Sequence, residues 1–243
     1  MNRLTWLKWP VLAMLLLTLA RQGDAQTLRR VLTPAEASAW RAVGSLNVLG
    51  AEACTAILIS PHEAITAAHC AVDSNTGKLR PVGLYQLILG QTSDNQSRRY
   101  RIAASAVLPG YLADDKTNAL AGIASDLALM TLATPVDPKD ATPMVVAGWD
   151  KPIGDFVDIL GYERGGPVDV TIREGCMVLD SLSGVSVANC SVISGLSGGP
   201  VVLSAPPGAA PTLVAVVSST GQGHAYVVTV APHLAELRAL LTK

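Results

Sequence analysis

Residues 195–200 read Gly195-Leu196-Ser197-Gly198-Gly199-Pro200, and this stretch decides how the rest of the 243-residue chain is interpreted. Glycines on both sides of Ser197 tolerate positive φ and carry no Cβ, so the backbone can form a sharp turn that exposes the hydroxyl. The N–H groups of Gly195 and Ser197 can then hold an oxygen that develops negative charge, and one such donor contributes about 3 kcal/mol. Ser197 is therefore a candidate nucleophile, although the hexapeptide alone also fits an ordinary hairpin.

Two further segments carry the groups that such a serine needs. Thr66-Ala67-Ala68-His69-Cys70 places a histidine after small residues and beside a cysteine that can be bonded to the preceding strand, which suits a general base. Asp126 directly precedes the apolar run Leu127–Met130, so a buried strand can aim its carboxylate at the imidazole N–H. Each segment alone has a plainer interpretation, either a structural histidine or a turn aspartate. Asp114 and Asp115 are the alternatives to Asp126.

The residues between these segments form short strand-like runs separated by turn residues. Runs at this spacing predict barrels or a sandwich, and they do not fit an alternating α/β fold. The stretch Pro135–Pro143, with three prolines, is the natural linker between two halves. After Pro232, four leucines share one helical face and predict a C-terminal amphipathic helix. The expected strands are Leu46–Leu49, Thr55–Ile59, Leu84–Leu89, Arg101–Leu108, Leu127–Leu132, Val157–Leu160, Val168–Ile172, Val185–Ala188, Val201–Leu203, Leu213–Ser218 and Tyr226–Val230.

The N-terminus has the pattern of an export signal. Arg3 and Lys8 precede the apolar run Val11–Ala20, and small or polar residues follow as far as Ala25. The run is shorter than the about 20 residues that span a bilayer. We expect residues 1–25 to be a signal peptide, with cleavage after Ala25 and, as second choice, after Ala20. A membrane anchor is the alternative.

The charge of the mature chain excludes two classes of partner. Removal of residues 1–25 leaves about 218 residues, of which 15 are basic and 18 acidic, a net charge of −3. This balance provides neither a basic surface for nucleic acid nor a polybasic patch for a membrane. The length suits one large domain or two small barrels.

Export also gives a meaning to the four cysteines. An even number of cysteines in an oxidising compartment indicates disulfides. Three connectivities are possible, and order along the chain favours Cys54–Cys70 and Cys176–Cys190. Each loop of about 15 residues would contribute roughly 3 kcal/mol in the chain-entropy model. Because no pair has C-x-x-C spacing, we prefer disulfides to a zinc site and expect no metal or organic cofactor.

His69, Asp126 and Ser197 occur in that order, at separations of 57 and 71 residues. This order distinguishes chymotrypsin-like barrels from subtilisins and from α/β-hydrolases. Over residues 43–231 the chain resembles the trypsin-like serine peptidase family. Residues 66–70 match the family's histidine motif, Asp126–Leu129 its aspartate motif, and residues 195–200 its serine motif except at Leu196.

The resemblance implies an all-β fold of two six-stranded antiparallel β-barrels with the active site in the cleft between them, followed by the C-terminal helix. We place an N-terminal segment at residues 26–42, the first barrel at 43–137, and the second barrel with the helix at 138–243. The segment Cys176–Cys190, followed directly by the serine turn, is most similar to small exported bacterial members.

The resemblance also implies which residues meet the substrate. Ser191, six residues before Ser197, would lie at the floor of the primary specificity pocket, where an Arg- or Lys-directed protease has aspartate. Ser218 would lie beside Asp126, and the segment Ser218-Ser219-Thr220 would be the edge strand that pairs with the substrate backbone. The region around His224 could form a pocket wall, although an ordinary loop is the preferred interpretation.

Leu196 is an informative departure from the family. In the animal digestive enzymes this position holds an aspartate that pairs with a freshly cut N-terminus, so we expect no such switch here, and at most trimming near Arg29-Arg30. The expected function is that of a secreted or periplasmic serine endopeptidase, a monomer that cleaves proteins or peptides through an acyl-enzyme. The alternatives are an inactive homologue that binds proteins and an exported esterase that uses the same three residues.

Overall fold

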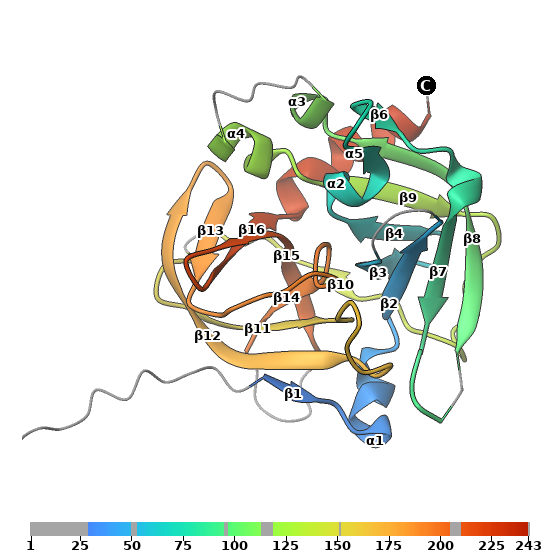
Figure 1. The fold of residues 1–243 in the computed structure, drawn as a ribbon, viewed down its shortest axis with the longest axis horizontal. Coiled ribbons are helices and arrows are strands. Elements are labelled where there is room, and N and C mark those ends of the chain that lie inside the picture. Colours follow the sequence, from blue (N-terminus) through green and yellow to red (C-terminus); the bar gives the residue numbers. More distant parts are fainter. Residues whose placement is uncertain are drawn as a thin grey trace, which may run out of the picture.

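The computed structural model describes residues 29–49, 53–94, 97–112, 119–150, 152–204 and 210–242. The expected signal peptide, together with Asp114 and Asp115, lies outside these residues. Two β-barrels lie side by side in Figure 1, the first in blue to yellow-green and the second in yellow to red. No helix within the described ranges is long and apolar enough to cross a membrane.

The first barrel is closed by antiparallel pairing in the order β2-β3-β4-β9-β8-β7. Its strands fold this way because aliphatic side chains alternate toward a common interior, where Leu46, Ile57 and Leu129 are completely buried. The strands are β2 (Val43–Val48), β3 (Cys54–Ser60), β4 (Glu63–Thr66), β7 (Tyr85–Leu89), β8 (Arg98–Val107) and β9 (Ala128–Leu132).

The second barrel follows the order β12-β11-β14-β15-β16-β13 and is closed by the pairing of β13 with β12. Its interior contains Ile159, Val214 and the half-cystines Cys176 and Cys190. The strands are β11 (Phe156–Gly161), β12 (Thr171–Leu182), β13 (Val185–Ala188), β14 (Pro200–Leu203), β15 (Thr212–Gly221) and β16 (His224–Thr229). The expected all-β fold of two six-stranded barrels is confirmed.

Short strands outside the barrels tie peripheral segments to them. β1 (Arg29–Val31) pairs antiparallel with β12, and β10 (Val145–Val146) pairs parallel with β15. β5 (Val72–Asp73) and β6 (Lys78–Leu79) form a hairpin.

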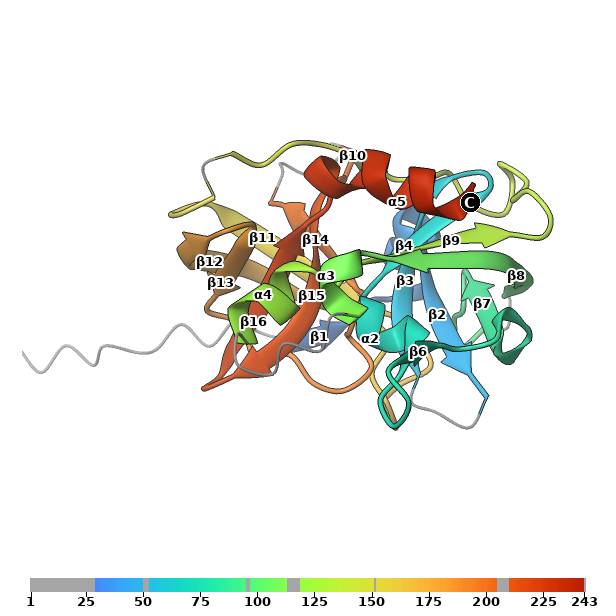
Figure 2. The same cartoon turned by 90° about the horizontal axis from the view of Figure 1, so that it is seen from above.

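Helices lie at the edges of the barrels. The α-helices are α1 (Pro34–Ala37), α2 (Ala68–Ala71), α3 (Pro109–Leu112), α4 (Ala119–Ala124) and α5 (Leu234–Leu241), and 3₁₀ turns cover Ser38–Trp40, Val82–Leu84 and Ala231–His233. The expected C-terminal helix is confirmed as α5. Figure 2 shows that α5 runs from the second barrel across to β8 and β9 of the first.

The strand expected at Val168–Ile172 is misplaced. β12 begins at Thr171 and continues through Arg173 as far as Leu182. The polar run Arg173-Glu174-Gly175 concealed the strand, because an arginine followed by a glutamate and a glycine is atypical of a buried strand. Arg173 is nevertheless buried, since it pairs with a buried carboxylate.

Candidate active site

His69 and Asp126 form a close pair between the barrels. His69 lies in the single turn of α2, where Ala67 and Ala68 are fully buried and small enough to let the turn pack tightly. Asp126 lies two residues before β9, and the buried Leu127 and Ala128 that follow anchor it in the core. Its Oδ2 lies 2.8 Å from His69 Nδ1, and its Oδ1 accepts the His69 backbone N–H at 2.8 Å. Both carboxylate oxygens therefore hold the same residue.

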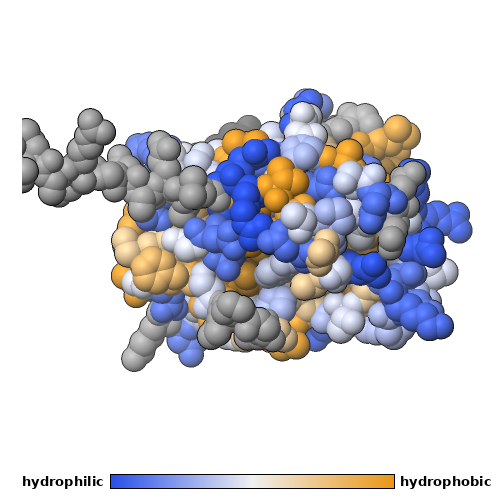
Figure 3. All heavy atoms as spheres, turned by 90° about the horizontal axis from the view of Figure 1, so that it is seen from below, coloured by the Kyte–Doolittle hydropathy of each residue, from blue (hydrophilic) through white to orange (hydrophobic). Residues whose placement is uncertain are grey.

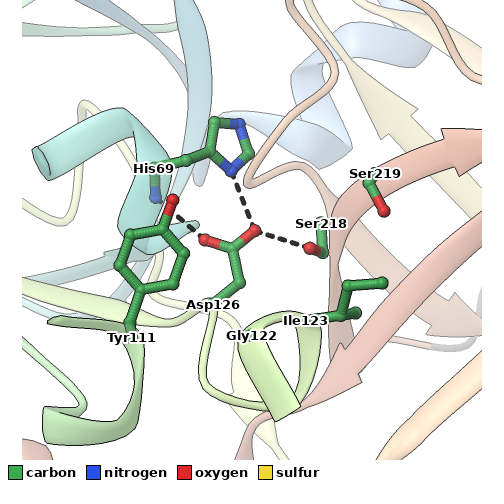
Figure 4. A pocket seen from close by; sticks show the side chains of 7 residues that line it. All are labelled: His69, Tyr111, Gly122, Ile123, Asp126, Ser218 and Ser219. Atoms are coloured by element: carbon green, nitrogen blue, oxygen red, sulfur yellow. Dashed lines mark hydrogen bonds and ion pairs between the residues drawn. The ribbon is translucent and has the colours of Figure 1, made fainter. Parts of the chain in front are cut away.

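Ser218 completes the surroundings of this carboxylate. Its hydroxyl donates to Asp126 Oδ2 at 2.5 Å, and both side chains are buried (Figure 4). The register of β15 against β16 shifts between Val217 and Ser219, so Ser218 occupies a bulge. A bulge re-aims a side chain within a strand. The bulge in β15 is the point at which the Ser218 hydroxyl is directed toward Asp126.

Two cavities share His69 as a common wall. The Asp126-side cavity, about 370 Å³, is lined by His69, Tyr111, Gly122, Ile123, Asp126, Ser218 and Ser219 (Figure 4). The Ser197-side cavity, about 420 Å³, is lined by His69, Ser194, Gly195, Ser197, the Cys54–Cys70 disulfide and residues of the β5–β6 hairpin. Burial, with Asp126 nearby, raises the pKa of Tyr111 to about 12, so its phenol stays protonated. Asp126 and Ser197 thus line different cavities, and His69 is common to both.

The first barrel holds the turn that carries Ser197. Thr55, fully buried in β3, donates its hydroxyl to the Gly195 carbonyl at 2.8 Å. Its backbone N–H donates to the Ser197 carbonyl, also at 2.8 Å. The same hydroxyl accepts the Tyr162 N–H at 3.0 Å. One residue of β3 therefore ties the serine turn of the second barrel to the strand that carries Cys54.

The peptide between Ser194 and Gly195 has a defined orientation. The Ser194 carbonyl accepts the Arg164 N–H at 2.9 Å. Because the two polar groups of a trans peptide point in opposite directions, the Gly195 N–H points away from Arg164. Within the described residues, the N–H groups of Gly195 and Ser197 have no backbone acceptor, whereas those of Leu196, Gly198 and Gly199 all do. The turn therefore keeps two N–H donors for an external acceptor.

A network of ion pairs adjoins the segment that leads into this turn. Glu163, with a side chain only 3% exposed, accepts Arg29 Nε at 2.6 Å, Arg29 Nη2 at 2.5 Å and Arg173 Nη2 at 2.9 Å. Arg173 also donates Nε to the Ser191 carbonyl at 2.8 Å. Burial alone would raise the pKa of Glu163, but the hydrogen bonds from Arg29 and Arg173 lower it below its usual value. Glu163 is therefore ionised at neutral pH.

The structure brings together most of the residues expected from sequence. His69 lines both cavities, Ser197 and Gly195 share one of them, and Asp126, Ser218 and Ser219 share the other. Ser191 and Thr220 line neither cavity; the Ser191 side chain is exposed, and Thr220 Oγ1 donates to the His224 carbonyl. Both expected disulfides, Cys54–Cys70 and Cys176–Cys190, are confirmed.

Sequence reasoning missed three groups around the site. Thr55, Glu163 and Tyr111 stand in segments that were expected only as a strand or a loop. No local pattern marks Glu163, because Arg173, the buried arginine that requires a carboxylate partner, lies in a strand that the sequence did not predict.

Two closed six-stranded barrels, with a histidine–aspartate pair and a glycine-rich serine turn at their junction, define the chymotrypsin-fold class of serine peptidases. The family model for trypsin matches residues 31–236, so the chain belongs to the trypsin family of serine endopeptidases. Among solved structures, a Glu endopeptidase determined in complex with MPD is similar in fold, with a TM-score of 0.73 at 15% identity. The alignment covers 90% of this chain and 99% of that one. No curated protein matches the sequence.

Proposed function

We propose that Ser197, His69 and Asp126 are the catalytic triad of an exported serine endopeptidase. The observation that carries the proposal is the pairing of His69 Nδ1 with Asp126 at 2.8 Å, with Ser197 and His69 lining the same second cavity. His69 Nε2 takes the proton of Ser197 as its hydroxyl attacks the carbonyl, and later gives that proton to the leaving amine. Asp126 keeps the imidazole in the required tautomer.

The Gly195 and Ser197 N–H groups serve as the oxyanion hole. Support comes from the Ser194–Gly195 peptide, whose carbonyl is held by Arg164 while its N–H faces away. Donors held before the reaction need no reorganisation when charge develops on the substrate oxygen. The acyl-enzyme then reacts with water by the same proton transfers in reverse.

The substrate runs past Ser218, Ser219 and Thr220 as an added strand. Ser218 and Ser219 line the cavity beside Asp126, where Tyr111 and Ile123 provide an apolar wall. Ser191 forms the floor of the primary pocket. Its backbone carbonyl accepts a hydrogen bond from Arg173, which holds this residue in place. The two disulfides support export to an oxidising compartment after removal of residues 1–25. The enzyme acts there as a monomer.

The proposal is tested by active-site labelling. A fluorophosphonate should label the wild-type protein at Ser197 and leave Ser197→Ala unlabelled, whereas Ser194→Ala, a serine on the same cavity, should still be labelled. No labelling of the wild type would identify an inactive homologue. A series of esters and peptides of increasing length then separates the two enzyme classes: rates should rise with length for a peptidase, and an esterase would ignore length.

A further inference from the structure

Arg29 attaches the N-terminal strand β1 to Glu163, which adjoins the serine turn in the second barrel. Arg29 lies opposite Arg173 in the β1–β12 pairing, and both arginines donate to Glu163. Leu32, which follows β1, is 2% exposed and donates its N–H to the Val170 carbonyl at 2.9 Å. Viewed from below, hydrophilic residues gather around the start of β1 (Figure 3). The strand is thus fixed both by its apolar end and by its charge.

Glu163 connects β1 to the serine turn through the residues on either side of it in the chain. Its neighbours in the chain, Tyr162 and Arg164, pack against Gly195 so closely that a Cβ built there would lie 2.5 Å from the Arg164 nitrogen and from the Tyr162 oxygen. Arg164 also donates its N–H to the Ser194 carbonyl at 2.9 Å. The position of the Glu163 backbone therefore sets the position of the Gly195 N–H.

Arg173 connects Glu163 to Ser191, which lies at the start of the segment that leads to Gly195. Its guanidinium, with a side chain only 3% exposed, bridges Glu163 and the Ser191 carbonyl. Segment 191–195 is therefore held at Ser191 by Arg173 and at Ser194 by Arg164. Both restraints converge on Glu163, and Arg29 is the only partner of Glu163 among the described residues that belongs to β1.

From these contacts we propose that Arg29 is a positioning residue for the oxyanion turn, so that docking of β1 on the second barrel is needed for full activity. The inference rests on the proposed function, because it assigns a role in the same reaction. Position 196 holds the apolar and buried Leu196, so no acidic side chain there can fix the turn. Arg29 fixes the turn instead, through Glu163. A cut after Arg29 or Arg30 would remove this restraint, so trimming of the chain must end before Arg29.

Arg30 provides a matched control for Arg29. It is the next residue of β1, and the two side chains are similarly exposed, at 45% for Arg29 and 40% for Arg30. Arg30 pairs with Glu36 and Glu174, and none of the hydrogen bonds described for these two carboxylates reaches the serine turn. Arg29→Ala and Arg30→Ala therefore remove similar amounts of charge and strand contact, and differ in whether Glu163 is affected.

The first measurement is ester hydrolysis by the full-length mature enzyme. We expect Arg29→Ala to lower kcat about tenfold, which corresponds to about 1.4 kcal/mol of transition-state stabilisation. Arg30→Ala should stay within about twofold of wild type. Arg29→Lys, which keeps one donor, should be intermediate, and guanidinium ion at millimolar concentration should raise kcat of Arg29→Ala alone. Equal kcat values for Arg29→Ala and Arg30→Ala would overturn the inference.

The second measurement does not depend on catalysis. Amide hydrogen exchange in segment 191–197 should be faster in Arg29→Ala than in Arg30→Ala, because the Glu163 restraint is weakened in only one of them. If the wild type is not labelled by fluorophosphonate, the proposed function fails, yet this exchange difference should remain. If labelling succeeds and exchange in the two variants is equal, the inference fails and the proposed function stands.

Discussion

Gly195 has no room for a side chain. Its φ of +99° belongs to the region that L-residues rarely adopt, and a Cβ would overlap the backbone of Tyr162 and Arg164. Gly195→Ala must therefore rotate the Ser194–Gly195 peptide or push away the loop that holds it. Because either change displaces the proposed oxyanion donor, we expect kcat/KM for an ester to fall by at least about 100-fold.

Gly83→Ala is the control for this substitution. A Cβ built at Gly83 has no neighbouring atom within 4 Å, and Gly83, in the 3₁₀ turn Val82–Leu84, lines neither of the two cavities. Its activity should equal that of wild type. Full activity of Gly195→Ala would contradict the assignment of the Gly195 N–H to the oxyanion hole. Circular dichroism of both variants separates misfolding from a local change at the turn.

At the scale of elements, the helix α5 gives a simple test of how the end of the chain is held. Leu237 is completely buried and belongs to the core that includes the first barrel, whereas Leu240 is half-buried on the same helix. Leu237→Ala should lower the free energy of unfolding by about 3 kcal/mol, and Leu240→Ala by about 1 kcal/mol. Urea unfolding measures both values. Equal losses would mean that α5 is not anchored through Leu237.

The same helix carries an ion pair whose contribution should be small. Arg238 donates to both oxygens of Glu63 in β4, with its own side chain 50% exposed. An exposed pair of this kind is screened by water and salt and contributes little to stability. Apolar burial at Leu237 therefore holds α5 in place, and the ion pair fixes its orientation on the first barrel.

Elements also show what could be predicted from the sequence. Strands with alternating aliphatic residues, the C-terminal helix and both disulfides follow from local patterns. His69 and Ser197 are recognisable from sequence as candidates, because each lies in a short segment with its own chemical reason. Thr55 and Glu163 are not predictable in this way, because their roles depend on contacts with residues 140 and 134 positions away. Such a contact leaves no periodic or local trace in the sequence.

At the scale of the whole molecule, two carboxylates, Glu63 and Glu163, connect separate elements through ion pairs with arginines. Each pair requires the ionised form of the carboxylate. Glu63 connects the first barrel to α5, and hydrogen bonds from Arg238 lower its pKa. Glu163 connects β1 to the second barrel; burial opposes ionisation there, but hydrogen bonds from Arg29 and Arg173 still lower its pKa below the ordinary value of a glutamate. A carboxylate with a lowered folded-state pKa contributes stability above its unfolded pKa and loses it as pH falls through the folded value. Stability should therefore be level above about pH 5 and decline below about pH 4.5.

Urea unfolding between about pH 7 and about pH 3 tests this dependence, with the double variant Glu63→Gln/Glu163→Gln as the comparison. The double variant should be less stable than wild type at neutral pH, because the arginines lose a charged acceptor. It should also lose less stability on acidification, because two of the groups that take up protons are gone. The two unfolding midpoints should therefore converge toward low pH. Parallel midpoints across the whole range would mean that other carboxylates, and not these two connections, determine the acid sensitivity of the molecule.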